Sequence, residues 1–94
     1  MGKDEVTLRL LEMTYTLHTF SGLGSALRLL REAAGLKRAQ VAERTGISQR
    51  RISRYEREEN IPALPTLDRL LVCYGVDGIG LSRALKEVRG ERPS

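Results

Sequence analysis

Glycines divide most of this chain into short stretches, and their spacing limits what the chain can fold into. Between residues 23 and 88, apolar residues recur every three or four positions, which is the repeat of one face of an α-helix. Gly35, Gly46 and Gly75 follow such stretches, where a residue in the left-handed conformation commonly ends a helix. The pattern predicts five short helices, over residues 23–34, 38–45, 49–58, 65–74 and 80–88. Because helices this short need tertiary packing to be stable, we expect an all-α fold, a compact five-helix bundle.

The first predicted helix has an apolar side and a charged side. Its apolar residues are spaced four, three and four positions apart, and we expect them to face the core: Leu23, Leu27, Leu30 and Ala34. We expect Arg28, Arg31 and Glu32 to face solvent. In the later helices the residues expected to point inward are Val41, Ala42, Ile52, Tyr55, Leu67, Leu70, Leu71, Tyr74, Leu81, Leu85 and Val88, with Cys73 as a small buried side chain.

Residues 1–20 fit two secondary-structure patterns. Five apolar residues lie on one face of a helix in this stretch: Val6, Leu10, Met13, Leu17 and Phe20. Alternation over residues 11–17 and several threonines fit a strand instead. We favour a helix, because its pattern covers the longer stretch and a single strand would have no partner. In either case the apolar side must be covered, by the rest of the domain, by a second copy or by a partner protein.

The length and composition exclude several protein classes. A chain of 94 residues holds one domain, which we assign to residues 23–89, with an extension over 1–22 and a frayed tail over 90–94. It has no run of eighteen apolar residues and no secretory leader, so we expect a cytoplasmic protein without a membrane partner. Cys73 alone cannot form an internal disulfide, and His18 is the single histidine, so we expect no metal site. We find no nucleophile with a base and no paired carboxylates, and predict neither an enzyme nor a cofactor.

The positive charge of the chain is concentrated in one segment. The whole chain carries a net charge of +4. Residues 37–57 hold seven basic and two acidic residues, a net +5, whereas the remainder holds nine basic and ten acidic residues, a net −1. A local basic stripe on a nearly neutral body is typical of a nucleic-acid site.

The basic segment coincides with two short helices joined by a tight turn, which is the helix-turn-helix pattern. The small Ala42 allows the two helices to cross closely, and Gly46 allows the backbone to turn with a positive φ. We expect the apolar Ile47 side chain to be buried under the turn, and Ser48 to cap the second helix. The sequence therefore predicts two helices held at a defined angle, the second of which is strongly basic.

The outward side of the second helix follows from its geometry. At about 100° per residue, Ile52 and Tyr55 mark the buried side, and Arg50 and Arg57 lie opposite to it. Ser53, Arg54 and then Gln49 flank these two arginines. Arginine pairs with guanine and glutamine with adenine in the major groove, and the first residues of such a helix reach the bases most easily. We predict that Gln49, Arg50 and Arg54 read bases, and that Ser48, Arg51 and Arg57 contact phosphates.

The sequence resembles the helix-turn-helix domain of phage-repressor and Cro-like proteins, the Xre family. The resemblance covers residues 23–88 and depends on LRLLREAAG, GLKRAQVAERTGISQRRISRYERE and PALPTLDRLLVCYGV. It implies a lambda-repressor-like bundle of five helices that binds operator DNA as a dimer and regulates transcription. The base-reading positions that it implies are again Gln49, Arg50 and Arg54.

Two residues depart from the family pattern. Lys37 and Arg38 stand where the family usually has a Ser or Thr cap followed by a Gln. Without the cap the helix loses about 1 kcal/mol, and two cations at a helix N-terminus oppose its dipole. A phosphate bound there would reverse the effect, so we predict that Lys37 and Arg38 contact the DNA backbone.

These observations predict a sequence-specific DNA-binding transcriptional regulator, a repressor that binds a palindromic operator as a homodimer. We expect a prokaryotic or phage protein that is associated with the nucleoid. The alternative is an antitoxin-type protein, which regulates its own operon and binds a partner protein through an arm over residues 1–20.

Overall fold

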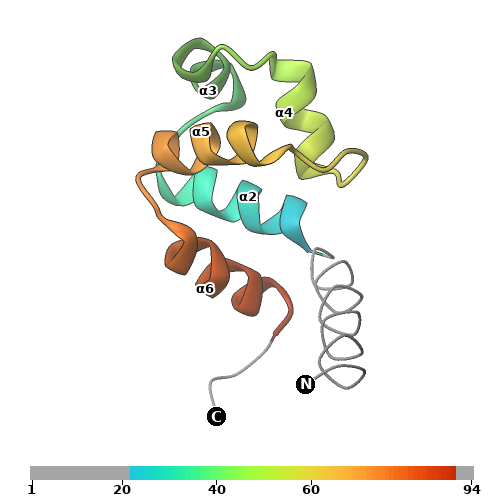
Figure 1. Ribbon diagram of the computed structural model, residues 1–94, viewed down its shortest axis with the longest axis vertical. Coiled ribbons are helices and arrows are strands. Elements are labelled where there is room, and N and C mark those ends of the chain that lie inside the picture. Colours follow the sequence, from blue (N-terminus) through green and yellow to red (C-terminus); the bar gives the residue numbers. More distant parts are fainter. Residues whose placement is uncertain (1–21, 91–94) are drawn as a thin grey trace, which may run out of the picture.

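The computed structural model describes residues 22–90, and the predictions made for residues 1–20, including His18, lie outside them. The described part of the chain contains no strand and folds into five helices: α2 (Leu23–Ala33), α3 (Arg38–Thr45), α4 (Gln49–Glu56), α5 (Leu64–Tyr74) and α6 (Gly78–Val88). This confirms the predicted all-α, five-helix bundle. Figure 1 shows α3 and α4 together at one end of the molecule and α6 toward the other.

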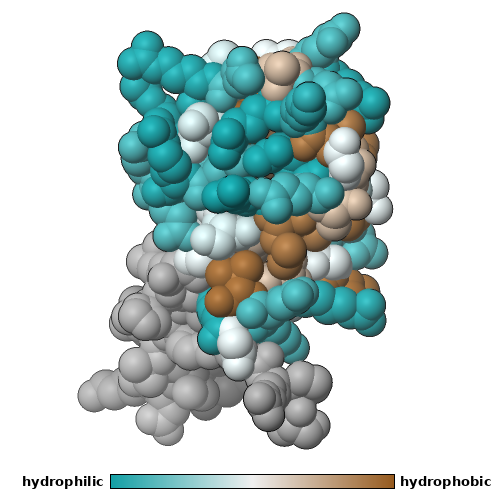
Figure 2. Space-filling view, turned by 180° about the vertical axis from the view of Figure 1, so that it is seen from behind, coloured by the Kyte–Doolittle hydropathy of each residue, from teal (hydrophilic) through white to brown (hydrophobic). Residues whose placement is uncertain are grey.

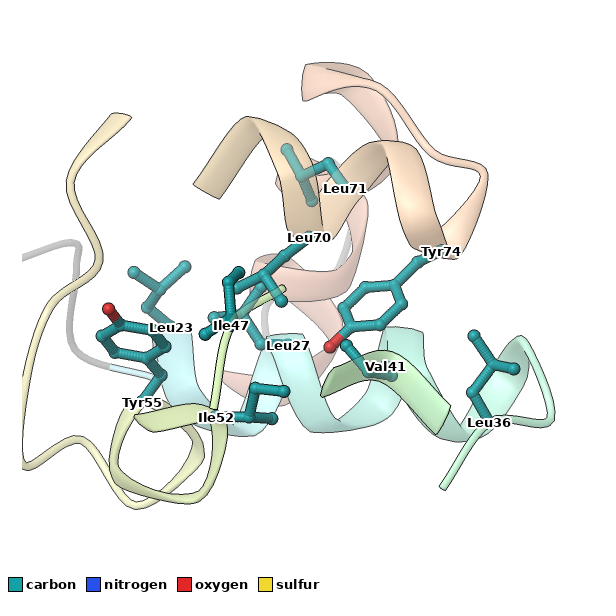
Figure 3. Packing of buried hydrophobic residues seen from close by; sticks show 10 residues of the cluster. All are labelled: Leu23, Leu27, Leu36, Val41, Ile47, Ile52, Tyr55, Leu70, Leu71 and Tyr74. Atoms are coloured by element: carbon teal, nitrogen blue, oxygen red, sulfur yellow. The ribbon is translucent and has the colours of Figure 1, made fainter. Parts of the chain in front are cut away.

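The helices surround one hydrophobic core. α2 packs against α4 and α6, and α3 packs against α4 and α5. Ten buried residues from four helices and two connecting segments form the centre of the core (Figure 3): Leu23, Leu27, Leu36, Val41, Ile47, Ile52, Tyr55, Leu70, Leu71 and Tyr74. Burial of these side chains is the main force that holds such short helices together.

The end of α2 and the start of α5 each lie one residue before the predicted position. Two other helix boundaries differ from the sequence prediction by two residues, each for a local reason. α4 ends at Glu56 rather than at residue 58, because Glu58 adopts the left-handed conformation with φ 60°. α6 begins two residues early, at Gly78, because the side chain of Asp77 caps it: Oδ1 accepts a hydrogen bond of 2.9 Å from the backbone N–H of Gly80.

The prediction that Arg31 faces solvent is wrong, and so is the prediction that Ala34 faces the core. Arg31 follows Leu27 by four residues, which places both on the inner side of α2, and the residue is buried. Ala34 lies just beyond the end of the helix and is exposed. Cys73 is only half-buried, although it packs against the core as expected.

The start of α2 lies directly on the end of α4, and Gly24 makes this contact possible. A Cβ atom at Gly24 would lie 2.5 Å from the carbonyl oxygens of both Tyr55 and Glu56. The backbone N–H of Gly24 also donates a hydrogen bond of 3.1 Å to Oε1 of Glu58. This carboxylate satisfies one of the free N–H groups at the helix start and is favoured there by the helix dipole.

Candidate nucleic-acid interface

The turn between α3 and α4 is held by its own hydrogen bonds. Gly46 has φ 76°, as predicted, and its N–H donates to the carbonyl of Ala42 over 2.9 Å. The Thr45 hydroxyl donates to the carbonyl of Val41 over 2.7 Å and accepts from the N–H of Ile47 over 3.1 Å. Ile47 is buried under the turn. The angle between the two helices is therefore set by backbone and core contacts rather than by surface side chains.

Helix α4 is capped and anchored as the sequence predicts. The Ser48 hydroxyl oxygen accepts a hydrogen bond of 3.2 Å from the N–H of Arg51. Ile52 and Tyr55 are buried on the inner side of the helix. On the outer side Gln49, Arg50, Arg51 and Arg57 are exposed, and Ser53 and Arg54 are half-buried.

Arg51 of α4 and Arg57, which caps the end of α4, already have partners within the protein. Arg51 Nη2 donates a hydrogen bond of 2.7 Å to the Tyr55 hydroxyl, and the guanidinium lies 5.7 Å from the centre of the Tyr55 ring. Tyr55 therefore orients Arg51 without covering it. Arg57 Nη2 lies 3.3 Å from Oε2 of Glu59, but both side chains are more than half exposed, so this pair is easily broken.

A buried ion pair connects α2 to α4. Glu56 Oε2 accepts from Arg31 Nε over 2.7 Å, and Oε1 accepts from Arg31 Nη2 over 3.0 Å, a two-pronged contact. Arg31 Nη1 also donates to the carbonyl of Leu36 over 2.9 Å. The hydrogen bond to Glu56 raises the pKa of Arg31, so the guanidinium stays charged.

A second arginine reaches the same carboxylate from α3. Arg38 Nε donates to Glu56 Oε1 over 3.1 Å, and the Arg38 side chain is 37% exposed. Among the described residues, neither Nη group of Arg38 has a hydrogen-bond partner. One buried carboxylate thus holds two guanidinium groups, which leaves a net positive charge at the start of α3.

A family model described as a helix-turn-helix domain matches residues 23–85, which is more than half of the chain. The chain belongs to this helix-turn-helix family. The match agrees with the resemblance to Xre-like DNA-binding proteins predicted from the sequence. No curated protein and no solved structure matches the chain.

The start of α3 in this helix-turn-helix domain is capped in a way that the sequence prediction missed. Lys37 occupies the N-cap position, and its ammonium group cannot accept a hydrogen bond. The Gln40 side chain compensates, because its Oε1 accepts from the backbone N–H of Lys37 over 2.8 Å. This is one half of a capping box. The Lys37 side chain is therefore not needed to stabilise the helix start.

Glu56 and Arg31 form a buried ion pair behind the candidate interface, and sequence reasoning missed it. From the sequence alone, Glu56 counts only as a negative charge that reduces the basic stripe, and Arg31 only as a solvated residue. The signal is nevertheless present: Glu56 lies four positions after the buried Ile52, and Arg31 four after the buried Leu27. Two opposite charges on inward helix faces are expected to pair, because an unpaired buried charge is costly.

The surface over α3 and α4 is mostly polar. Figure 2 shows the face opposite to that of Figure 1, and its upper part, over these helices, is dominated by hydrophilic residues. Within residues 22–90 there is no cluster of three or more potential metal ligands. No helix in the same range is long and apolar enough to cross a membrane. The chemistry available at this surface is therefore hydrogen bonding and positive charge.

Proposed function

We propose that this helix-turn-helix protein is a sequence-specific transcriptional repressor that binds a palindromic operator as a homodimer, with α4 in the major groove. The observation that carries the proposal is the orientation of α4. Its inner side is fixed by Ile52 and Tyr55, and its outer side presents Gln49 and Arg50 to solvent at the start of the helix. The first residues of a recognition helix are those that reach base edges.

The proposed base readers differ in how freely they can move. Gln49 and Arg50 are exposed, and Arg54 is half-buried one turn further along. Arginine can donate two hydrogen bonds to guanine, and glutamine can exchange two with adenine. Each such pair discriminates against a wrong base by about 1–3 kcal/mol. Three readers on one helix would select a short half-site, and two-fold symmetry would repeat it.

The proposed phosphate contacts are Lys37, Arg38, Ser48, Arg51 and Arg57. Glu56 and Tyr55 support this role, because they hold Arg38 and Arg51 through one N–H each. An arginine oriented in this way loses less side-chain entropy when it binds a phosphate. Arg57 can exchange its exposed contact with Glu59 for a phosphate at little cost.

Selection of bound DNA from a random pool, with the full chain, tests the proposal. We expect a palindromic consensus, and we expect Arg50→Ala to lose preference at one base pair of each half-site at a cost of about 1–3 kcal/mol. Arg83→Ala is the control, because Arg83 is an exposed arginine on α6, far along the chain from α4. Recovery of unselected sequences would contradict specific binding, and an unchanged consensus with Arg50→Ala would remove Arg50 from the reading set.

A further inference from the structure

The Gln40 side chain has a fixed orientation at the start of α3. Its amide oxygen accepts the hydrogen bond of 2.8 Å from the backbone N–H of Lys37, which holds the side chain over the first turn of the helix. Because the donor is an N–H group, the accepting atom can only be the amide oxygen, and the NH2 group of the amide is left free. The residue is exposed, and no acceptor within residues 22–90 contacts this NH2 group. Gln40 therefore presents two N–H donors to solvent.

The stability of α3 does not explain why this residue is a glutamine. A glutamate could accept the same hydrogen bond, and the helix dipole would favour its negative charge at this end of the helix. A glutamate would also lie close to the positive charges of Lys37 and Arg38, and the first turn of α3 holds no acidic residue. A bound anion reverses this preference, because a carboxylate repels an anion whereas an amide NH2 group donates hydrogen bonds to it.

The charges around Gln40 favour an anion. Arg31, Lys37 and Arg38 carry three positive charges, and Glu56 is the acidic residue that contacts the two arginines, which leaves a net charge of +2. Both oxygens of Glu56 already accept hydrogen bonds from these arginines. The Lys37 side chain makes no cap hydrogen bond, so the first N–H groups of α3 are also available to an acceptor.

We propose that Gln40 is a further contact of this protein with the DNA backbone, in which its NH2 group donates to a phosphate oxygen beside the contacts proposed for Lys37 and Arg38. The backbone N–H of Lys37 holds the amide in place, and a donor oriented in this way loses less side-chain entropy on binding. Phosphates are the same in every sequence, so the contact adds affinity without base preference. This inference rests on the proposed function, because it needs DNA at the start of α3.

NMR spectroscopy can observe this contact directly, because the chain has few side-chain NH2 groups of the amide type. Gln40, Gln49 and Asn60 are the residues that carry one, so the full chain should give three pairs of side-chain amide signals. The Gln40→Glu variant identifies the Gln40 pair by its absence. The probes are a short DNA duplex of unselected sequence and a duplex selected by the protein. We expect both duplexes to shift the Gln40 pair, whereas the shift of the Gln49 pair should depend on the sequence.

The Gln40→Glu variant also separates DNA binding from folding. Its carboxylate can still cap α3, so the urea midpoint should not fall. Its affinity for both duplexes should fall alike, by about tenfold or more, because a hydrogen bond to a charged phosphate is lost and a like charge is added. Ser82→Glu adds the same charge at an exposed site on α6, and as the control it should change the affinity by less than about twofold.

A neutral variant separates the lost contact from the added charge. Gln40→Met removes both donors and adds no charge, so it should still weaken binding to both duplexes, by about threefold or more.

Three results would overturn the Gln40 contact while DNA binding by the parent still stands. The first is a Gln40 amide pair that does not shift with a duplex that shifts other signals. The second is an affinity of Gln40→Met equal to that of the parent, since repulsion alone would then explain Gln40→Glu. The third is a loss of affinity in Gln40→Glu together with a lower urea midpoint, which would make the role of Gln40 structural. A parent chain whose signals no duplex shifts would overturn the proposed function together with this contact.

Discussion

Replacement of Glu56 by glutamine removes one negative charge from the interior and leaves two arginines facing a neutral amide. The Glu56 side chain is 2% exposed and that of Arg31 is 9% exposed, so water cannot replace the lost carboxylate. Removal of one partner of a buried ion pair costs about 3–5 kcal/mol. The remaining amide oxygen and the carbonyl of Leu36 still accept from Arg31, which favours the lower end, about 3 kcal/mol. A domain of this size has a total stability of only about 5–10 kcal/mol.

Urea denaturation followed by circular dichroism measures this loss as a lower midpoint with an unchanged slope. The matched control is Glu32→Gln, which makes the same change in an exposed pair: Arg28 Nε lies 2.7 Å from Glu32 Oε1, and both side chains are more than half exposed. We expect no measurable loss there, because water screens the pair. Equal effects of the two substitutions would refute the reasoning, since burial would then not decide the strength of the Glu56 pair.

Three further predictions follow from other contacts. Gly24→Ala should lower the free energy of unfolding by about 1–3 kcal/mol, because the added Cβ would meet two carbonyl oxygens. Gly78→Ala is the control and should leave stability unchanged, because the space around Gly78 is open. Equal urea midpoints for the two variants would contradict the prediction. Arg38→Ala should weaken binding to all DNA sequences alike and reduce the slope of log affinity against log salt by about 1; a loss confined to one base would show that Arg38 reads sequence. Burial raises the pKa of Tyr74 above its ordinary value of 10.0, so this tyrosine ionises in the unfolded chain before it ionises in the folded one. The free energy of unfolding should therefore fall as the pH rises past 10, by up to about 1.4 kcal/mol per pH unit. Tyr74→Phe should make this fall shallower, and an identical alkaline profile would disprove the assignment.

The local features of the fold could be predicted from the sequence. Helical spacing and glycine stops predicted the number of helices, and Ile52 and Tyr55 predicted which side of α4 faces the core. The Ser48 cap and the Gly46 turn were also predicted, because each depends on residues only a few positions apart. The exposed positions of Gln49 and Arg50 could be predicted for the same reason, because both residues lie within a few positions of Ile52. Their contacts with bases stay predictions.

The contacts between helices could not be predicted from local sequence patterns. Arg31 and Glu56 are 25 positions apart, and Gly24 and Glu58 are 34 positions apart. Nothing in the local pattern of either helix specifies that these residues meet. Burial of Arg31 becomes understandable only when the carboxylate that neutralises it is known.

The sequence by itself determined the number of helices, the turn, the apolar anchor residues of α4 and the segment that carries the positive charge. These depend on backbone conformation and on a repeat of 3.6 residues, which act over one or two turns. Only the tertiary structure decided that one buried carboxylate holds two arginines, that a glycine lets α2 lie on the end of α4, and that Leu64 and Val72 of α5 are exposed within residues 22–90. Each of these depends on which helices pack together, and that is settled by the burial of the whole core at once rather than by any single stretch of sequence.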